Sequence, residues 1–346
     1  MSGIVMSMDD AIDVPIDSVA GRGEVVVPTP ADALSVLVEA ALKDARSLAR
    51  NAYSDATLRA YAADWQDFLA WCRQAGVRAL PAEPRFVAAY IAARARAVGR
   101  SALRRRLAAI THQHRLHRQE FLATDPTIQL TLRGVLRQHG LNCRPAAALT
   151  SVELRRLVAT CESDLVGARD RALLLIGFAG ALRRSELVGI DHEHLQFSPL
   201  GLRILLPRSK GDPEGVGTEI GISSGKRADT CPVAALTVWL DRSQLHLGPV
   251  FRGIDRYGGI GEGRLSTEAV RLILRRRAAA AGLEPGAGER LSPHGLRAGF
   301  VTEAYLAGAR DESIMGHTRH RDLKTMRRYV RRAKLVADSP VKLLDI

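Results

Sequence analysis

Apolar residues recur at steps of three and four positions along the first half of the chain, which is the spacing of an amphipathic helix. The pattern predicts five helices, over residues 31–49, 54–75, 85–97, 101–117 and 126–139. We therefore expect an all-helical domain over residues 31–141. Before it, residues 1–30 mix Gly, Pro, Ser and Asp without periodicity, and we predict a flexible acidic tail there.

The pattern changes after residue 141. Residues 142–149, which hold Pro145 and three alanines, are predicted to form a linker. Thr150 and Glu153 then make a capping-box sequence, in which the Thr150 hydroxyl accepts a backbone amide and Glu153 reaches back to the start of the helix. We expect a second domain to begin there and to cover residues 150–334, followed by a C-terminal tail over residues 335–346.

The second domain mixes two kinds of pattern. Strand-like runs at residues 202–207 and 219–222 flank a turn rich in glycine and charge, which predicts a small antiparallel sheet. Helices are predicted over residues 170–181, 231–236, 266–281, 294–307 and 321–333. The expected fold class is therefore mainly α, with a small antiparallel β-sheet in the second domain.

Charge adds a class of partner to this picture. The 346 residues include 50 Lys and Arg against 37 Asp and Glu, a formal net charge of +13. Residues 1–30 hold five acidic residues and one arginine, a net of −4, which leaves +17 on the rest. Such a basic chain favours nucleic acid as the partner, although a merely soluble basic protein would carry the same charge.

Arginines gather on and just after the helix predicted at residues 101–117, and they make a basic surface suited to phosphates. A solvated charged face is the alternative interpretation. These arginines are Arg104, Arg105, Arg106, Arg115 and Arg118.

Cysteine spacing and hydropathy exclude several classes. Cys72, Cys143, Cys161 and Cys231 are scattered, without the spacing of a zinc site or a disulfide framework, so we expect free thiols in a reducing cytoplasm. No apolar run approaches the roughly 20 residues of a membrane span, and the acidic N-terminus does not resemble a signal peptide. We expect a cytoplasmic protein that contacts no membrane.

Candidate chemistry lies near the C-terminus. His294 and Arg297 are three positions apart at the start of a predicted helix, so both side chains can meet one phosphate. His320 and Tyr329 follow, and basic residues flank the tyrosine. A phosphodiester under attack needs cations around its oxygens, a nucleophile in line and a proton donor for the leaving oxygen. The arrangement therefore indicates a tyrosine that attacks a DNA phosphate.

These residues resemble the tyrosine recombinase, or phage integrase, family over about residues 54–334. The resemblance implies a helical core-binding domain and a mainly helical catalytic domain that form a C-shaped clamp on double-stranded DNA. The first family box, an arginine followed three residues later by glutamate, matches Arg183 and Glu186. Arg183 would bind a non-bridging oxygen of the scissile phosphate and Glu186 would support it. The neighbouring Arg184 competes for this place, but the glutamate spacing favours Arg183.

The resemblance assigns roles to three further residues. The family's lysine sits in a β-turn, where Lys210 matches it, and an ammonium there would protonate the departing 5′ oxygen. Lys226 is a weaker alternative. In the second box His294 would be general base or hydrogen-bond donor, and Arg297 the second clamp on the phosphate oxygens.

Two histidines compete for the next family position. His320 lies nine residues before Tyr329, which fits the family pattern, and we expect it to be a hydrogen-bond donor to the phosphate. His317 lies twelve residues before the tyrosine and would be a neighbour. Arg319 is a departure from the pattern, because many relatives carry glycine before the histidine, and this puts the local turn geometry in doubt.

Tyr329 is the expected nucleophile. A free phenol has a pKa of about 10, so attack requires the electropositive surroundings and a nearby base. Arg327 and Arg328 beside it are expected to contact DNA, whereas Tyr305 is expected to pack in the core.

The family's reaction is expected to need neither ATP nor a divalent metal, and the sequence has neither a P-loop nor a carboxylate cluster for magnesium, so we expect no cofactor. Exchange between two duplexes implies a homotetramer on DNA, in which residues 335–346 would dock onto a neighbouring subunit or fray. A mobile-element integrase is the favoured biological role. The alternatives are relaxation of supercoils, as by a type IB topoisomerase, and a non-catalytic accessory protein that binds DNA.

Overall fold

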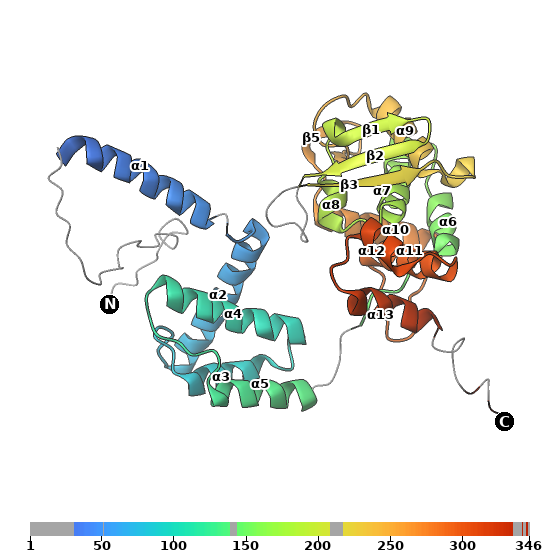
Figure 1. Ribbon diagram of the computed structural model, residues 1–346. Coiled ribbons are helices and arrows are strands. Elements are labelled where there is room, and N and C mark those ends of the chain that lie inside the picture. The colour runs from blue at the N-terminus through green and yellow to red at the C-terminus, as the bar shows by residue number, and fades with distance from the viewer. Residues whose placement is uncertain are drawn as a thin grey trace. The chain divides into compact units, whose positions relative to one another are not determined.

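The computed structural model describes residues 31–50, 52–138, 144–207, 217–334, 341 and 344. The chain divides into two compact units, residues 1–143 and residues 144–346. The described residues form mainly helices together with two small antiparallel sheets (Figure 1). The expected fold class is confirmed. The tail predicted over residues 1–30 and the turn that carries Lys210 lie outside the described residues.

All the regular secondary structure among the described residues of the first unit is helical. Its helices are α1 (Ala31–Arg50), α2 (Asp55–Ala75), α3 (Pro84–Arg94), α4 (Arg100–Leu116) and α5 (Pro126–Gln138). Ser54 begins α2 by accepting the amide of Thr57, and Gly76 ends it in the left-handed conformation, with φ of 67°. The periodic apolar residues of α2 pack against α3, α4 and α5 around Phe68, Tyr90 and Ile110. This packing holds α4 in place and leaves one of its faces exposed.

The second unit contains a three-stranded antiparallel sheet in the order β1-β2-β3. Its strands are β1 (Leu195–Ser198), β2 (Gly201–Leu206) and β3 (Thr218–Ser223). Leu202 and Ile204 on β2 lie opposite Ile222 and Ile220 on β3, and all four are buried. A second hairpin pairs β4 (Arg252–Ile254) with β5 (Ile260–Arg264). The strand predictions at residues 202–207 and 219–222 are confirmed, but β1, β4 and β5 were not predicted.

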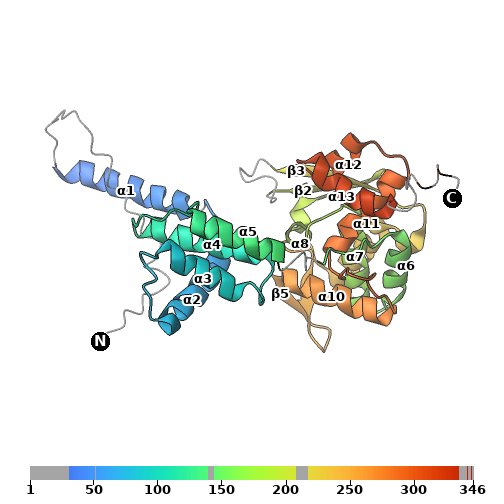
Figure 2. The same ribbon diagram turned by 90° about the horizontal axis from the view of Figure 1, so that it is seen from below.

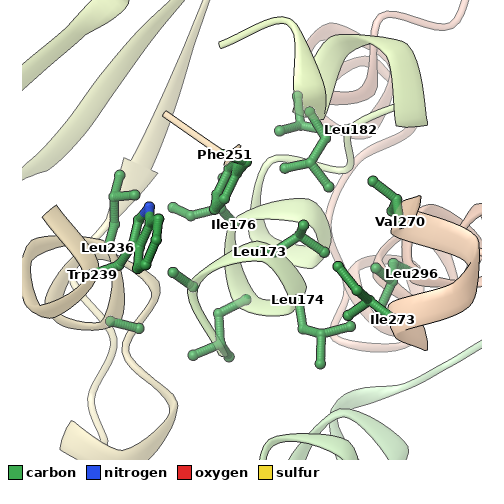
Figure 3. Packing of buried hydrophobic residues seen from close by; sticks show 14 of the residues in the cluster. Leu173, Leu174, Ile176, Leu182, Leu236, Trp239, Phe251, Val270, Ile273 and Leu296 are labelled. Carbon is green, nitrogen blue, oxygen red and sulfur yellow. The ribbon is translucent and has the colours of Figure 1, made fainter. Parts of the chain in front are cut away.

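Helix α7 (Leu165–Ala179) is the centre of the second unit. Ten of its fifteen residues are buried, because neighbours cover it on all sides. Figure 3 shows Leu173, Leu174 and Ile176 of this helix among Trp239, Ile273 and Leu296 from other helices. The surrounding helices are α6 (Ser151–Ala159), α8 (Arg184–Val188), α9 (Pro232–Ser243), α10 (Thr267–Ala280) and α11 (His294–Leu306).

The segment before α6 differs from the predicted linker. Residues 144–149 belong to the second unit, where the amides of Ala147 and Leu149 donate to the carbonyls of Arg290 and Gly295 at 3.0 and 2.9 Å. A side chain at Gly295 would clash with the Ala147 carbonyl, so the glycine permits this close approach. At the start of α6, the Glu153 carboxylate accepts the Thr150 amide at 2.8 Å and also its hydroxyl. The predicted helix start is confirmed.

The last two described helices, α12 (Asp311–Thr318) and α13 (Leu323–Lys334), pack against α11 (Figures 1 and 2). Val301, Ile314, Met326 and Val330 form a small core between them. Tyr329 is partly buried against this core, which fixes the direction of its side chain.

Cys72, Cys161 and Cys231 are free and buried, whereas Cys143 lies outside the described residues. Among the described helices, none combines the length and the apolar character that crossing a membrane requires.

Candidate active site

The turn between α7 and α8 positions Arg183. Ala181 adopts a positive φ of 45°, and Arg183, two residues later, is the N-cap of α8. The Glu186 carboxylate accepts the backbone amide of Arg183 at 2.9 Å and its guanidinium at 2.5 Å. Burial acts to raise the pKa of Glu186, but the Arg183 amide and the charges of Arg319 and Arg183 hold it below its ordinary value. The carboxylate is therefore ionised and fixes the Arg183 side chain.

Arg297 approaches the same turn from α11. Its side chain is buried, and Nη1 donates to the Ala181 carbonyl at 2.7 Å. Burial and the nearby charges of Arg183 and Arg319 lower the pKa of Arg297 to about 10, so the group stays cationic at neutral pH. Nη2 is buried and has no hydrogen-bond acceptor among the described residues. A buried unpaired donor is costly, and an anionic oxygen would satisfy it.

His294 and Tyr329 meet beside these arginines. Tyr329 Oη and His294 Nε2 are 2.6 Å apart. Dehydration of the His294 ring by the surrounding protein lowers its pKa, and Arg297 and Arg183 lower it further. Burial raises the pKa of Tyr329, although Arg297, Arg328 and Arg183 act against this. At neutral pH the phenol is therefore protonated and the imidazole neutral, so the hydroxyl can donate to the ring.

The structure separates the two competing histidines. The His320 ring lies 6.0 Å from the Tyr329 ring, centroid to centroid, and its Nδ1 hydrogen-bonds the Thr318 hydroxyl at 2.7 Å. His317 instead stacks on Phe300 and hydrogen-bonds the Ala179 carbonyl at 2.7 Å. Burial and the charges of Arg297 and Arg183 lower the pKa of His320 to about 4. A neutral His320 therefore stands beside the tyrosine, and His317 faces α7.

Arg184 and Lys226, the alternatives to Arg183 and Lys210, are both exposed. Nη1 of Arg184 lies 3.5 Å from the Thr267 carbonyl. Lys226 is exposed in the segment after β3. Lys210 lies in the connection between β2 and β3, outside the described residues, so its expected role stays a prediction.

Comparison with known proteins shows the family to which this chain belongs. Residues 147–335 match the model of the phage integrase family. An integrase/recombinase XerD homolog of Selenomonas ruminantium is 36% identical over 290 residues, which are 83% of this chain and 84% of the relative. The chain belongs to the phage integrase family. It is a tyrosine recombinase, a site-specific enzyme that cleaves and rejoins DNA strands.

Solved structures of tyrosine recombinases share its fold. The Tn1549 transposon integrase in complex with transposon right end DNA superposes with a TM-score of 0.59 at 12% identity, covering 84% of this chain and 96% of that one. The XerH recombinase in a post-cleavage complex with difH substrate gives a TM-score of 0.54 at 17% identity, covering 74% and 72%.

The four arginines of the predicted basic surface that lie on α4 of this recombinase divide between two environments. Arg104 and Arg115 are exposed and line a hollow of about 340 Å³ with Tyr53, Tyr61 and His112. The other two, Arg105 and Arg106, have internal partners.

Arg106 is largely buried, and its Nε donates to the Tyr90 hydroxyl at 2.9 Å and to Asp67 at 3.3 Å. Arg105 makes two hydrogen bonds with the buried Asp64. The carboxylate and phenol oxygens that accept from Nε of Arg106 compete with the expected phosphate contact, which stays a prediction. For Arg105 the Asp64 pair competes with that contact.

Near the tyrosine, Arg327 and Arg328 are both exposed. Arg327 donates to Asp311 at 3.0 Å, which ties α13 to α12. Tyr305 packs beside the core of Val301 and Ile314, the position expected of a structural aromatic residue.

Sequence reasoning missed a third arginine at the site. In the sequence Arg319 is only a departure from the family pattern, yet its side chain is buried and donates to Glu186 at 2.9 Å. A long side chain where glycine was expected was the available signal. Its contacts depend on the turn after α7, which is more than 130 residues earlier in the chain.

Proposed function

We propose that Tyr329 is the nucleophile of this recombinase and that His294 is its general base. The hydrogen bond of 2.6 Å between Tyr329 Oη and His294 Nε2 carries this proposal, because it joins a neutral acceptor to the phenol that must lose a proton. Oη attacks the scissile phosphorus while the bond from phosphorus to the 5′ oxygen breaks. The products are a 3′-phosphotyrosyl bond and a free 5′ hydroxyl.

Arg183 and Arg297 bind the non-bridging oxygens in this proposal. Both guanidiniums lie around the Ala181–Glu186 turn, and Nη2 of Arg297, which has no acceptor among the described residues, would donate to a phosphate oxygen. They stabilise the charge that builds up on the phosphorane, which is where fixed donors contribute most to catalysis. His320 donates a further hydrogen bond through Nε2 once the negative phosphate raises the pKa of its ring and the ring is protonated, because the neutral ring uses its one N–H at Nδ1 toward Thr318. Lys210 gives its proton to the departing 5′ oxygen.

The partner is double-stranded DNA. Residues 31–141 serve as the core-binding domain and residues 150–334 as the catalytic domain. Arg104 and Arg115 on α4 contact phosphates, since both are exposed on one helix face. Arg328 contacts DNA next to Tyr329. A homotetramer forms on two recombination sites, and the reaction serves a mobile element.

Strand exchange between two duplexes tests this function. The purified protein is given a labelled duplex that carries the DNA flanking its own gene, a second duplex of different length, and EDTA. We expect recombinant strands with the wild type and with Tyr305→Phe, and none with Tyr329→Phe. Relaxation of a plasmid without strand exchange would favour the topoisomerase alternative. Binding without cleavage would favour the accessory role.

A further inference from the structure

Arg319 occupies a backbone position that does not suit it. It ends α12 with φ of 58° and ψ of 42°, the left-handed conformation that residues with a Cβ rarely adopt. Its side chain is only 7% exposed, and its Nε is buried without an acceptor among the described residues. Both features cost stability, and such strain tends to cluster at functional sites.

The guanidinium of Arg319 joins two distant segments. Nη1 donates to the His317 carbonyl at 2.7 Å, and Nη2 donates to the Glu186 carboxylate at 2.9 Å. Nη2 also lies 3.4 Å from the carbonyls of Gly180 and Ala181. The end of α12, one residue before His320, is thereby tied to the turn that carries Arg183.

The atoms that Arg319 binds also hold the two phosphate-binding arginines. Glu186 accepts the Arg183 guanidinium on Oε1, and on Oε2 it accepts both the Arg183 amide and the Arg319 guanidinium. The Ala181 carbonyl accepts from Arg297 at 2.7 Å and faces Arg319 at 3.4 Å. The Arg319 guanidinium therefore contacts both the carboxylate that holds Arg183 and the carbonyl that holds Arg297.

We propose that Arg319 is a positioning residue, which fixes Glu186 and the Ala181 carbonyl so that Arg183, Arg297 and His320 converge on one phosphate. This role rests on the proposed function. Glu186 is a single carboxylate shared between two guanidiniums, so Arg183 is not fully neutralised and keeps its attraction for the phosphate. Arg319 does not touch the reacting atoms. It acts through the groups that do.

Arg319→Gly and Arg319→Lys test the role. Glycine suits the backbone and removes the side chain, whereas lysine keeps the charge but loses the planar fork. The rate of covalent adduct formation is measured at saturating protein on a nicked duplex, together with DNA affinity and thermal midpoint. We expect Arg319→Gly to be about 10- to 100-fold slower, with affinity for DNA within about 2-fold of the wild type because no DNA contact is lost. The rate of adduct formation by Arg319→Lys should lie between the rates of the wild type and of Arg319→Gly.

Arg277→Lys is the matched control. Arg277 is another buried arginine of the second unit, paired with the buried Asp170 rather than with Glu186. We expect this change to lower the thermal midpoint and to leave the adduct rate near that of the wild type. A double variant, Arg319→Gly with Glu186→Gln, should be no slower than the slower single variant, because both act on one support.

Three results would overturn the role: a wild-type rate in Arg319→Gly, a loss of rate matched by an equal loss of affinity, or equal slowing by Arg277→Lys. If Arg319→Gly does not fold, Arg319→Lys decides, and a wild-type rate there overturns the role. No adduct from the wild-type protein would instead remove the proposed function and this role with it.

Discussion

At the scale of single residues, adjacent arginines have opposite surroundings. Arg183 is held by a buried carboxylate, whereas Arg184 is exposed and lies 3.5 Å from the Thr267 carbonyl. We predict that Arg183→Ala slows adduct formation by about 100- to 1,000-fold, the usual effect of removing one preorganised donor. Arg184→Ala should stay within about 3-fold of the wild type. Single-turnover rates on a nicked duplex measure both, and equal loss in the two variants would contradict the assignment.

The lowered pKa of His294 predicts a pH dependence. The ring stays neutral, and able to accept a proton, as the pH falls through the ordinary histidine value of 6.5. Adduct formation at subsaturating protein, which reports the free enzyme, should therefore fall only below pH 6.5. His294→Gln cannot titrate, so it should be slow throughout and lack this acidic limb. A midpoint above 6.5 in the wild type would contradict His294 as the base.

Lys210 can be tested through its leaving group. Lys210→Ala should slow cleavage of an ordinary duplex by about 100-fold or more, the contribution of a general acid. The rate should recover when sulfur replaces the bridging 5′ oxygen, since a thiol with a pKa of about 8.5 leaves without protonation. Lys226→Ala is the control and should match the wild type on both duplexes. Slow cleavage of the sulfur duplex by Lys210→Ala would argue against proton donation.

Residue chemistry could be predicted where a short motif carries it. The spacing of Arg183 and Glu186, and of His294 and Arg297, is local, and the structure brings these four side chains and Tyr329 into one site. Arg319 could not be assigned a role in this way, because its partners lie more than 130 residues away. Residue type alone did not separate Arg106 from Arg104, since only the packing of α2 and α3 gives Arg106 its partners.

At the scale of elements, we expect the exposed face of α4 to bind DNA and its packed face to stabilise the first unit. Arg104→Ala and Arg115→Ala should each weaken DNA binding and lower the salt slope by about 0.9, without a change in thermal midpoint. Arg106→Ala should cost roughly 1–3 kcal/mol of stability, because it removes the hydrogen bonds of Arg106 to the buried Tyr90 hydroxyl and to the Asp67 carboxylate. Salt titrations and denaturant unfolding measure the two effects. If Arg106→Ala bound DNA more weakly and kept the stability of the wild type, Arg106 would be a DNA-binding residue and not a structural one.

Elements with an apolar stripe were predicted well, and the others were not. The helices of the first unit were expected within a few residues of their ends. The prediction for α7 began at residue 170, because a helix buried on all sides has no stripe to mark its start at Leu165. Helix α12 has eight residues and only one buried aliphatic side chain, Ile314, so it has no periodic pattern to detect. Strand β1 is four residues long and mostly exposed.

At the scale of the whole molecule, each unit has its own core. The buried cluster around α7 lies within residues 144–346, and the cluster around α2 lies within residues 1–143. We therefore predict that a fragment of residues 144–346 folds alone and unfolds cooperatively in a thermal melt followed by circular dichroism. The same fragment should bind DNA more weakly than the full chain, since it lacks Arg104 and Arg115. A fragment without a cooperative transition would show that its core depends on the first unit.

The central claim is that Tyr329 becomes covalently joined to DNA. The most direct measurement is to trap the adduct on a nicked suicide duplex in EDTA, digest the protein and identify the modified peptide by mass spectrometry. We predict one modified residue, Tyr329, carrying the phosphate at a 3′ end. A phosphate on any other residue, or an adduct that persists in Tyr329→Phe, would contradict the account.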